Sequence, residues 1–235
     1  MSFEQDYIDL FLRKRSGHMA QYVYMYRPHI YEDIIKQDSY YPFKMESDLL
    51  IQLSHDLCKN FKNVKHVLEV GPGSETPILS KTVPFLRALN SHVESFIYTA
   101  VDSTREYAEQ ASKLVDQHLE GIQTQALEID FLTSNAFEDI KKDIHPDDKK
   151  LMICFGQPIF ANNNDGDIEK LLKNISHFLH EDDYILFGVD TNHDEALLES
   201  AYNTKSLHDL MLNAMHHLKC TLQLEDFNTE AFDFV

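Results

Sequence analysis

The feature that most constrains the fold of this sequence is an apolar run that stops at a tight turn bounded by glycines. Residues 66–70 read as a strand, and Gly71, Pro72 and Gly73 follow directly, before a helical pattern over residues 75–90. Glycine in such a turn lets the backbone approach a ligand without a side-chain clash. The pattern therefore predicts a strand, a ligand-binding turn and a helix, the opening unit of a doubly wound α/β fold.

Strand-like and helical patterns continue to alternate along the chain. Helical stretches of about 12 to 16 residues separate the apolar runs, which is the spacing of βαβ units. The last two runs are almost continuously apolar, as in strands buried on both faces of a parallel sheet. We therefore expect a mostly parallel, doubly wound sheet. Its further strands are expected within residues 96–102, 125–130, 151–156 and 184–190.

The two ends of the chain differ from this central part. Residues 1–64 are helical in pattern and rich in tyrosine, so we expect an N-terminal helical cap there that contributes to a substrate site. Residues 65–235 are expected to form the ligand-binding domain. After the fifth apolar run only one more helical pattern, near residues 206–218, and a short tail remain. The fifth strand is thus expected near a sheet edge, covered by the tail, a second copy or a partner chain.

Composition narrows the class of protein. The 235 residues include 43% hydrophobic and 26% charged residues, as in a globular chain with a real core. The net charge of -18 disfavours nucleic-acid and membrane partners and suits a cationic small molecule. The sequence shows neither a membrane-spanning apolar window nor a secretory signal, and its three cysteines are widely spaced. We expect a soluble, cytoplasmic protein.

The turn itself favours S-adenosylmethionine (AdoMet) over a dinucleotide. Pro72 has no N–H, which lowers the density of donors that a pyrophosphate would need. Thr76 stands where the dinucleotide pattern has its third glycine. Glu69 lies two residues before Gly71, where a carboxylate can reach the cationic methionine end of AdoMet.

Two acids end the next strands. Asp102 closes the second strand, where a carboxylate can accept hydrogen bonds from both ribose hydroxyls. Asp130 ends the third strand beside Phe131, and its side chain or the neighbouring backbone could contact an adenine amino group. Each acid could instead cap the helix that follows its strand.

Taken together, these stretches resemble the histidine Nα-methyltransferase family of the ergothioneine pathway, which also includes tryptophan-type amino acid N-methyltransferases. The resemblance implies a Rossmann-like class I methyltransferase fold and AdoMet-dependent methylation of the α-amino group of a free amino acid. By position, it implies that Tyr24, Tyr40 and Tyr202 line the acceptor site. It also implies a set of cofactor-binding residues. The matching stretches include Tyr40-Tyr41-Pro42 followed by Glu46, residues 68–74, Val101-Asp102, Asp130-Phe131, Phe155-Gly156, residues 186–190, Ala201-Tyr202 and residues 227–232. The implied cofactor residues are Glu69, Gly71, Gly73, Asp102, Asp130, Phe131 and Gly156.

The sequence departs from the family pattern in two places. Asn162 matches the family's amine-binding asparagine only with a shift of one residue, and Phe160 replaces a glycine. The family's C-terminal part, which surrounds the imidazole, lies beyond the end of this sequence, so the acceptor stays open: a small amine or an amino acid.

Two alternatives remain. One is aminocarboxypropyl transfer from AdoMet, which yields methylthioadenosine rather than S-adenosylhomocysteine (SAH). The other is a non-catalytic binding module completed by a partner or second subunit. Residues 161–172 fail as a calcium loop, and we expect no metal site.

Overall fold

The computed structural model describes residues 5, 8, 9, 22–24, 26, 27, 29–131, 136–142, 144–157 and 165–232. The chain forms two compact units, one of Pro42–Asp190 and one that combines Met1–Tyr41 with Thr191–Val235. This division differs from the boundary expected at residue 64. The helix before the first strand belongs to the sheet unit because its apolar face is part of the sheet's core, and the C-terminal helices pack against the N-terminal segment.

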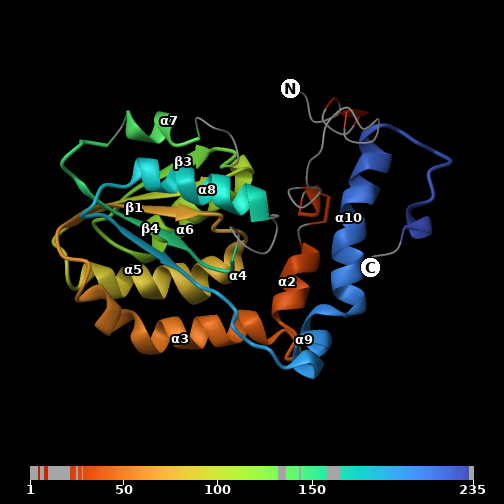
Figure 1. The fold of residues 1–235 in the computed structure, drawn as a ribbon, viewed down its shortest axis with the longest axis horizontal. Coiled ribbons are helices and arrows are strands. Elements are labelled where there is room, and N and C mark those ends of the chain that lie inside the picture. The colour runs from red at the N-terminus through yellow and green to blue at the C-terminus, as the bar shows by residue number, and fades with distance from the viewer. Residues whose placement is uncertain are drawn as a thin grey trace. The chain divides into compact units, whose positions relative to one another are not determined.

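The larger unit is built on a sheet of five parallel strands in the order β3-β2-β1-β4-β5 (Figure 1). The expected parallel, doubly wound α/β fold is therefore confirmed. Because the chain moves outward from β1 to β3 and then returns to β4, the strand order reverses between β1 and β4. The strands are β1 (Val64–Val70), β2 (Ile97–Asp102), β3 (Gln123–Glu128), β4 (Lys149–Cys154) and β5 (Tyr184–Phe187).

Helices cover both faces of this sheet. On one face α3 (Tyr41–Cys58), α5 (Val83–Asn90) and α6 (Arg105–His118) pack on side chains such as Val67 and Ile153. On the other face α7 (Glu138–Lys141) and α8 (Asp165–Phe178) pack on Leu68 and Met152. Neighbouring residues of one strand point to opposite faces, so both must be apolar here.

Among the described residues the fifth strand lies at an edge of the sheet, as expected. In the described part of the chain β5 pairs only with β4. It is less buried than β4, and Phe187 is 37% exposed. The described part of the tail contains a short 3-10 helix, η3 (Thr229–Ala231). No helix among the described residues is long and apolar enough to cross a membrane.

The helix that follows the glycine turn contains a π-helical segment. It runs through α4 (Glu75–Pro77), the π-helix η2 (Ile78–Thr82) and α5, and the Val83 amide donates to the Ile78 carbonyl. Pro84 follows and has no N–H, so the regular i to i−4 ladder cannot pass through this point. In this segment both Lys81 and Thr82 are buried.

The smaller unit is helical. It contains α2 (His29–Ile35), α9 (Glu195–Tyr202) and α10 (Lys205–Thr221), and α10 lies against α2 (Figure 1). Apolar side chains of α10 pack on the described N-terminal residues and on α2. The buried Asn213 also donates from Nδ2 to the Val23 carbonyl at 2.5 Å. These contacts explain why two segments from opposite ends of the sequence form one unit.

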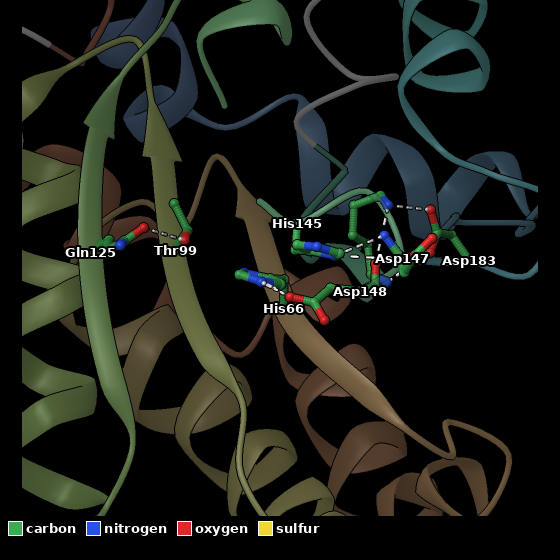
Figure 2. A network of polar contacts seen from close by, with 8 residues as sticks. His66, Thr99, Gln125, His145, Asp147, Asp148 and Asp183 are labelled. Atoms are coloured by element: carbon green, nitrogen blue, oxygen red, sulfur yellow. Dashed lines mark hydrogen bonds and ion pairs between the residues drawn. The ribbon is translucent and has the colours of Figure 1, made fainter. Parts of the chain in front are cut away.

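Polar side chains hold the amino ends of the strands in the sheet unit. The buried Lys150 at the start of β4 pairs with Asp183 at 2.9 Å, and Asp183 also accepts from the His180 amide. Burial acts to raise the pKa of Asp183, but these hydrogen bonds outweigh it and lower the pKa below its usual value. In Figure 2 the His66 ring points toward Asp148, with 3.1 Å between Nε2 and Oδ2. This network lies at the end of the sheet opposite to the glycine turn.

Candidate cofactor site

The glycine turn follows the carboxyl end of β1. Gly71 and Gly73 have φ values of 67° and 72°, a region that favours glycine. The Gly71 amide donates to the Val101 carbonyl at 2.8 Å, which ties the turn to β2. A Cβ placed on Gly73 would meet nothing within 4 Å, so this glycine borders open space. The turn therefore offers bare backbone to a ligand at the end of the sheet.

Ser74, directly after the turn, carries an unsatisfied hydroxyl. Its Oγ is buried and has no hydrogen-bond partner among the described residues. It stands at the N-cap of α4 but makes no capping hydrogen bond. Buried polar atoms normally have a partner, so an orphaned hydroxyl beside a bare turn indicates a place for a polar ligand group.

Asp102 is the last residue of β2 and lies beside the turn. Its Oδ1 accepts from the Thr104 amide at 2.9 Å. Burial raises the pKa of Asp102 to about 6, although hydrogen bonds from the backbone amides of Thr104, Gly73 and Ser103 act in the opposite direction. A carboxylate has about four lone-pair positions. The three amides take three of these positions, so Asp102 can organise the turn and still accept about one hydroxyl group of a ligand.

Asp130 and Phe131 follow β3 on the far side of Asp102. The strand ends two residues before Asp130, and the Ile129 amide donates to the Asp102 carbonyl at 2.8 Å. This bond holds the segment after β3 close to the end of β2. Asp130 is exposed, whereas Phe131 packs on the apolar cluster beneath α7 and α8.

Glu69 lies one residue before the end of β1, and its carboxylate contacts neighbouring side chains. The Thr82 hydroxyl donates to Oε1 at 2.6 Å and the Tyr98 hydroxyl donates to Oε2 at 2.5 Å. Burial raises the pKa of Glu69 to about 7, and the bonds from Thr82 and Tyr98 partly offset this effect. The carboxylate therefore forms a buried acidic centre close to the glycine turn, with each oxygen held by a hydroxyl.

Gly156 follows β4 with a φ of 79°. Its amide donates to the Glu46 carboxylate of α3, at 2.9 Å to Oε2 and 3.1 Å to Oε1. Lys81 of η2 reaches the same carboxylate. Since β1 and β4 are neighbours, Gly156 and the glycine turn follow adjacent strand ends on the two sides of the point where the strand order reverses. In open α/β sheets ligands bind in the crevice at this point.

The predicted acceptor residues belong to the smaller unit or lie outside the described residues. Tyr40 and Tyr202 are brought together, with ring centroids 5.8 Å apart in an edge-to-face contact. Tyr24 makes a similar contact with Tyr31 at 5.5 Å. Asn162 lies outside the described residues.

Three residues near the predicted site were not expected from the sequence. Ser74, Lys81 and Thr82 all follow the glycine turn within the helix interrupted by Pro84. In the sequence Lys81 stands between Ser80 and Thr82, three residues before Pro84, so no local pattern indicated that it would be buried. Glu46 stands in a stretch that resembles the family, but its partners are far away in the sequence.

The sequence matches, over residues 19–235, the family described as "Histidine-specific methyltransferase, SAM-dependent". The chain belongs to this family. Membership confirms the family that the motifs around the glycine turn indicated, and with it AdoMet as the expected cofactor. The described residues fit this cofactor, because a bare turn, an unsatisfied hydroxyl and a carboxylate converge at the switch point.

Two solved methyltransferase structures are similar to this chain at low sequence identity. An AdoMet-dependent methyltransferase from Clostridium acetobutylicum is 20% identical, with 68% of this chain and 55% of that chain covered and a TM-score of 0.41. The plantazolicin methyltransferase BpumL, solved in complex with SAH, is 16% identical, with 96% and 81% covered and a TM-score of 0.49. This chain thus spans about half the length of the first of these proteins. No curated protein matches the sequence significantly.

Proposed function

We propose that this chain transfers the methyl group of AdoMet to the nitrogen of a small amine or free amino acid, with histidine as the first candidate acceptor. The observation that carries the proposal is the convergence of the glycine turn, the Ser74 hydroxyl and Asp102 at the switch point of a sheet from a methyltransferase family. When bound, AdoMet supplies a methyl carbon on cationic sulfur: the N–C bond forms as the C–S bond breaks, the electron pair stays on sulfur to give SAH, and the amine proton leaves to solvent.

The cofactor roles follow from the position of each group. The turn at Gly71 and Gly73 admits the ligand close to the backbone, and the Ser74 hydroxyl donates to one of its polar groups. Asp102 accepts a ribose hydroxyl in a charge-assisted hydrogen bond. Asp130 and Phe131 contact the adenine, and Gly156 borders the opposite side of the crevice. Glu69 stabilises the sulfonium through its charge, because Thr82 and Tyr98 already hold its two oxygens.

For the acceptor we propose that Tyr40 and Tyr202 hold the carboxylate through their hydroxyls, with Tyr24 beside them and Asn162 at the amine. The contact between the Tyr40 and Tyr202 rings supports a shared role for these two residues. In this proposal the N-terminal residues bind the acceptor together with Asn162 and Tyr202, and the cofactor is bound by residues between Glu69 and Gly156. Orientation of the amine toward the methyl group would supply most of the rate enhancement.

Product analysis tests the reaction. The full chain is incubated with AdoMet and a panel of histidine, tryptophan, other amino acids and simple amines, and products are identified by mass spectrometry. SAH together with an N-methylated acceptor is expected, and Asp102→Asn should lower its formation. Methylthioadenosine would instead identify aminocarboxypropyl transfer. If the protein binds AdoMet but consumes none with any acceptor, the binding-module alternative replaces the proposed activity.

Hydroxyl deletions test the acceptor site once an acceptor is known. Tyr40→Phe and Tyr202→Phe should raise the KM for the acceptor about 10-fold each, because a hydrogen bond to a carboxylate is worth about 1.5–3 kcal/mol. Tyr184→Phe is the matched control: this tyrosine lies in β5 and its ring packs on Phe61. Equal KM values for all three variants would remove Tyr40 and Tyr202 from the site.

The exposed edge of β5 suggests a second chain. We propose that another copy of this protein or a partner chain covers it, since in the described part of the chain only β4 pairs with β5. Light scattering of the purified protein should give a mass above 27.3 kDa if the partner is a second copy. If the protein is monomeric at all concentrations, a second copy does not cover β5, and only a different partner chain could do so.

A further inference from the structure

Glu46 connects a helix to the end of a distant strand. It lies on α3, and its carboxylate accepts the Gly156 amide, two residues beyond the end of β4. Gly156 has a positive φ and is itself exposed. Glycine has the widest backbone freedom of any residue, so a turn built on it keeps one conformation only if other groups hold it. In the described structure, Glu46 supplies such a hold on the Gly156 amide.

Lys81 provides the charge that balances Glu46. Its ammonium is 2% exposed and lies 2.5 Å from Glu46 Oε2, and it also sits 4.5 Å from the centroid of the Phe43 ring. A buried ammonium is costly unless it is paired and hydrogen-bonded. Lys81 comes from η2, in the helix that begins directly after the glycine turn. The ion pair therefore links this helix to α3, and the hydrogen bond from the Gly156 amide to Glu46 continues the connection to the segment after β4.

Gly188 leaves the room that the Glu46 carboxylate occupies. It follows β5 directly, and a Cβ at this position would lie 2.1 Å from Glu46 Oε1 and 3.0 Å from Cδ. Any larger residue at position 188 would have to displace the carboxylate. Four segments thus meet at one carboxylate: α3, η2 and the ends of β4 and β5.

We propose that Glu46 is a positioning residue for the cofactor site: paired with Lys81, it holds the Gly156 turn in the conformation that binds AdoMet. The inference rests on the proposed function, because it assigns Gly156 to the cofactor crevice. Glu46 acts through the Gly156 amide and not by contact with the cofactor. A crevice whose second wall is held in advance loses less conformational entropy when the ligand binds.

Two variants release the turn in different ways. The double variant Glu46→Ala/Lys81→Met removes both charges, so that no buried ammonium is left unpaired. Gly188→Ala keeps both charges but places a Cβ where Glu46 Oε1 lies, so the carboxylate must leave its position at the Gly156 amide. Each should weaken SAH binding, measured by calorimetry on the full chain, about 5- to 20-fold, since a hydrogen bond to a charged group accounts for roughly that factor or more. Combining the two changes should add little, because both break the same contact.

The control is a second buried ion pair at the other end of the same sheet. Lys150→Met/Asp183→Asn neutralises a pair whose side chains are 3% and 2% exposed. This variant should lower thermal stability as the Glu46 variant does, but leave the affinity for SAH within about two-fold of the unaltered protein. It thereby separates a positioning role from a general loss of stability.

A second readout needs no ligand. Amide hydrogen exchange in the segment 154–157 should become faster in Glu46→Ala/Lys81→Met and in Gly188→Ala, and stay unchanged in the control variant. Unaltered SAH affinity in both Glu46-directed variants, or equal weakening in the control, would overturn the positioning role. Failure of the unaltered protein to bind SAH would overturn the proposed function instead, and unchanged exchange at Gly156 would then also reject Glu46 as its anchor.

Discussion

The ionisation of Asp102 should set the affinity for the cofactor below neutral pH. Burial raises the pKa of this carboxyl to about 6. At about pH 7.5 nearly all of it is ionised, whereas at about pH 5 only about one tenth is, so the form that accepts a ribose hydroxyl becomes about 10-fold rarer. If only the ionised form binds well, the dissociation constant for SAH should rise about 10-fold between these two values, equivalent to about 1.4 kcal/mol.

Calorimetry of SAH binding at several pH values, at constant ionic strength, measures this dependence. SAH is preferred to AdoMet because its neutral sulfur reduces the response to the Glu69 charge. The matched variant Asp102→Asn should bind more weakly near neutral pH and lose the dependence between about pH 5 and 7. An affinity of the unaltered protein that stays constant over this range, or a pH dependence that survives in Asp102→Asn, would refute the role given to this carboxylate.

Three further predictions follow from buried polar groups. The folded-state pKa of Glu69, about 7, lies above the unfolded value of 4.5, so the free energy of unfolding should fall by about 3 kcal/mol as pH rises from 4.5 to about 7. Denaturant unfolding should show a smaller fall in Glu69→Gln, and an identical pH profile in the variant would contradict this role of Glu69. Ser74→Ala should weaken SAH binding about 2- to 10-fold with little change in thermal stability, because the Ser74 hydroxyl has no partner among the described residues. A variant that is less stable but binds SAH with unchanged affinity would argue against a contact between this hydroxyl and the ligand. Asp183→Asn should lower the free energy of unfolding by about 3–5 kcal/mol in chemical denaturation, because Lys150 is left buried without its counter-charge. A decrease below about 1 kcal/mol would show that the ammonium finds another partner or solvent.

Local patterns carried most of the information on the proposed cofactor site. The glycine turn and Asp102 follow strand ends, and the carboxyl ends of parallel strands lie at one edge of a sheet. Once the strands were predicted to be parallel, it followed that the glycine turn and Asp102 lie close together. The same reasoning placed Gly156 at this edge, but it could not predict which side chain holds its amide, because Glu46 precedes it by 110 residues.

Glu69 shows what the motif by itself leaves open. Its place beside the glycine turn suggested contact with the methionine end of the cofactor. The direction of a strand side chain is set by the pleat, and in the structure this pleat turns the carboxylate toward Thr82 and Tyr98. Thr82 reaches it from the π-helical segment, whose geometry differs from that of a regular helix. A motif therefore indicated the acid but not its partners.

By itself the sequence determined the α/β class, the order of its strands and helices along the chain, the glycine turn and the acids at the strand ends. These depend on periodicity and on backbone demands that act over a few residues. Tertiary structure decided which distant groups meet: the Glu46–Lys81 pair at Gly156, the contact of Tyr40 with Tyr202, and the grouping of Thr191–Val235 with the N-terminal segment. Such contacts depend on how apolar faces and buried charges find partners across the whole chain, and no local pattern encodes that choice.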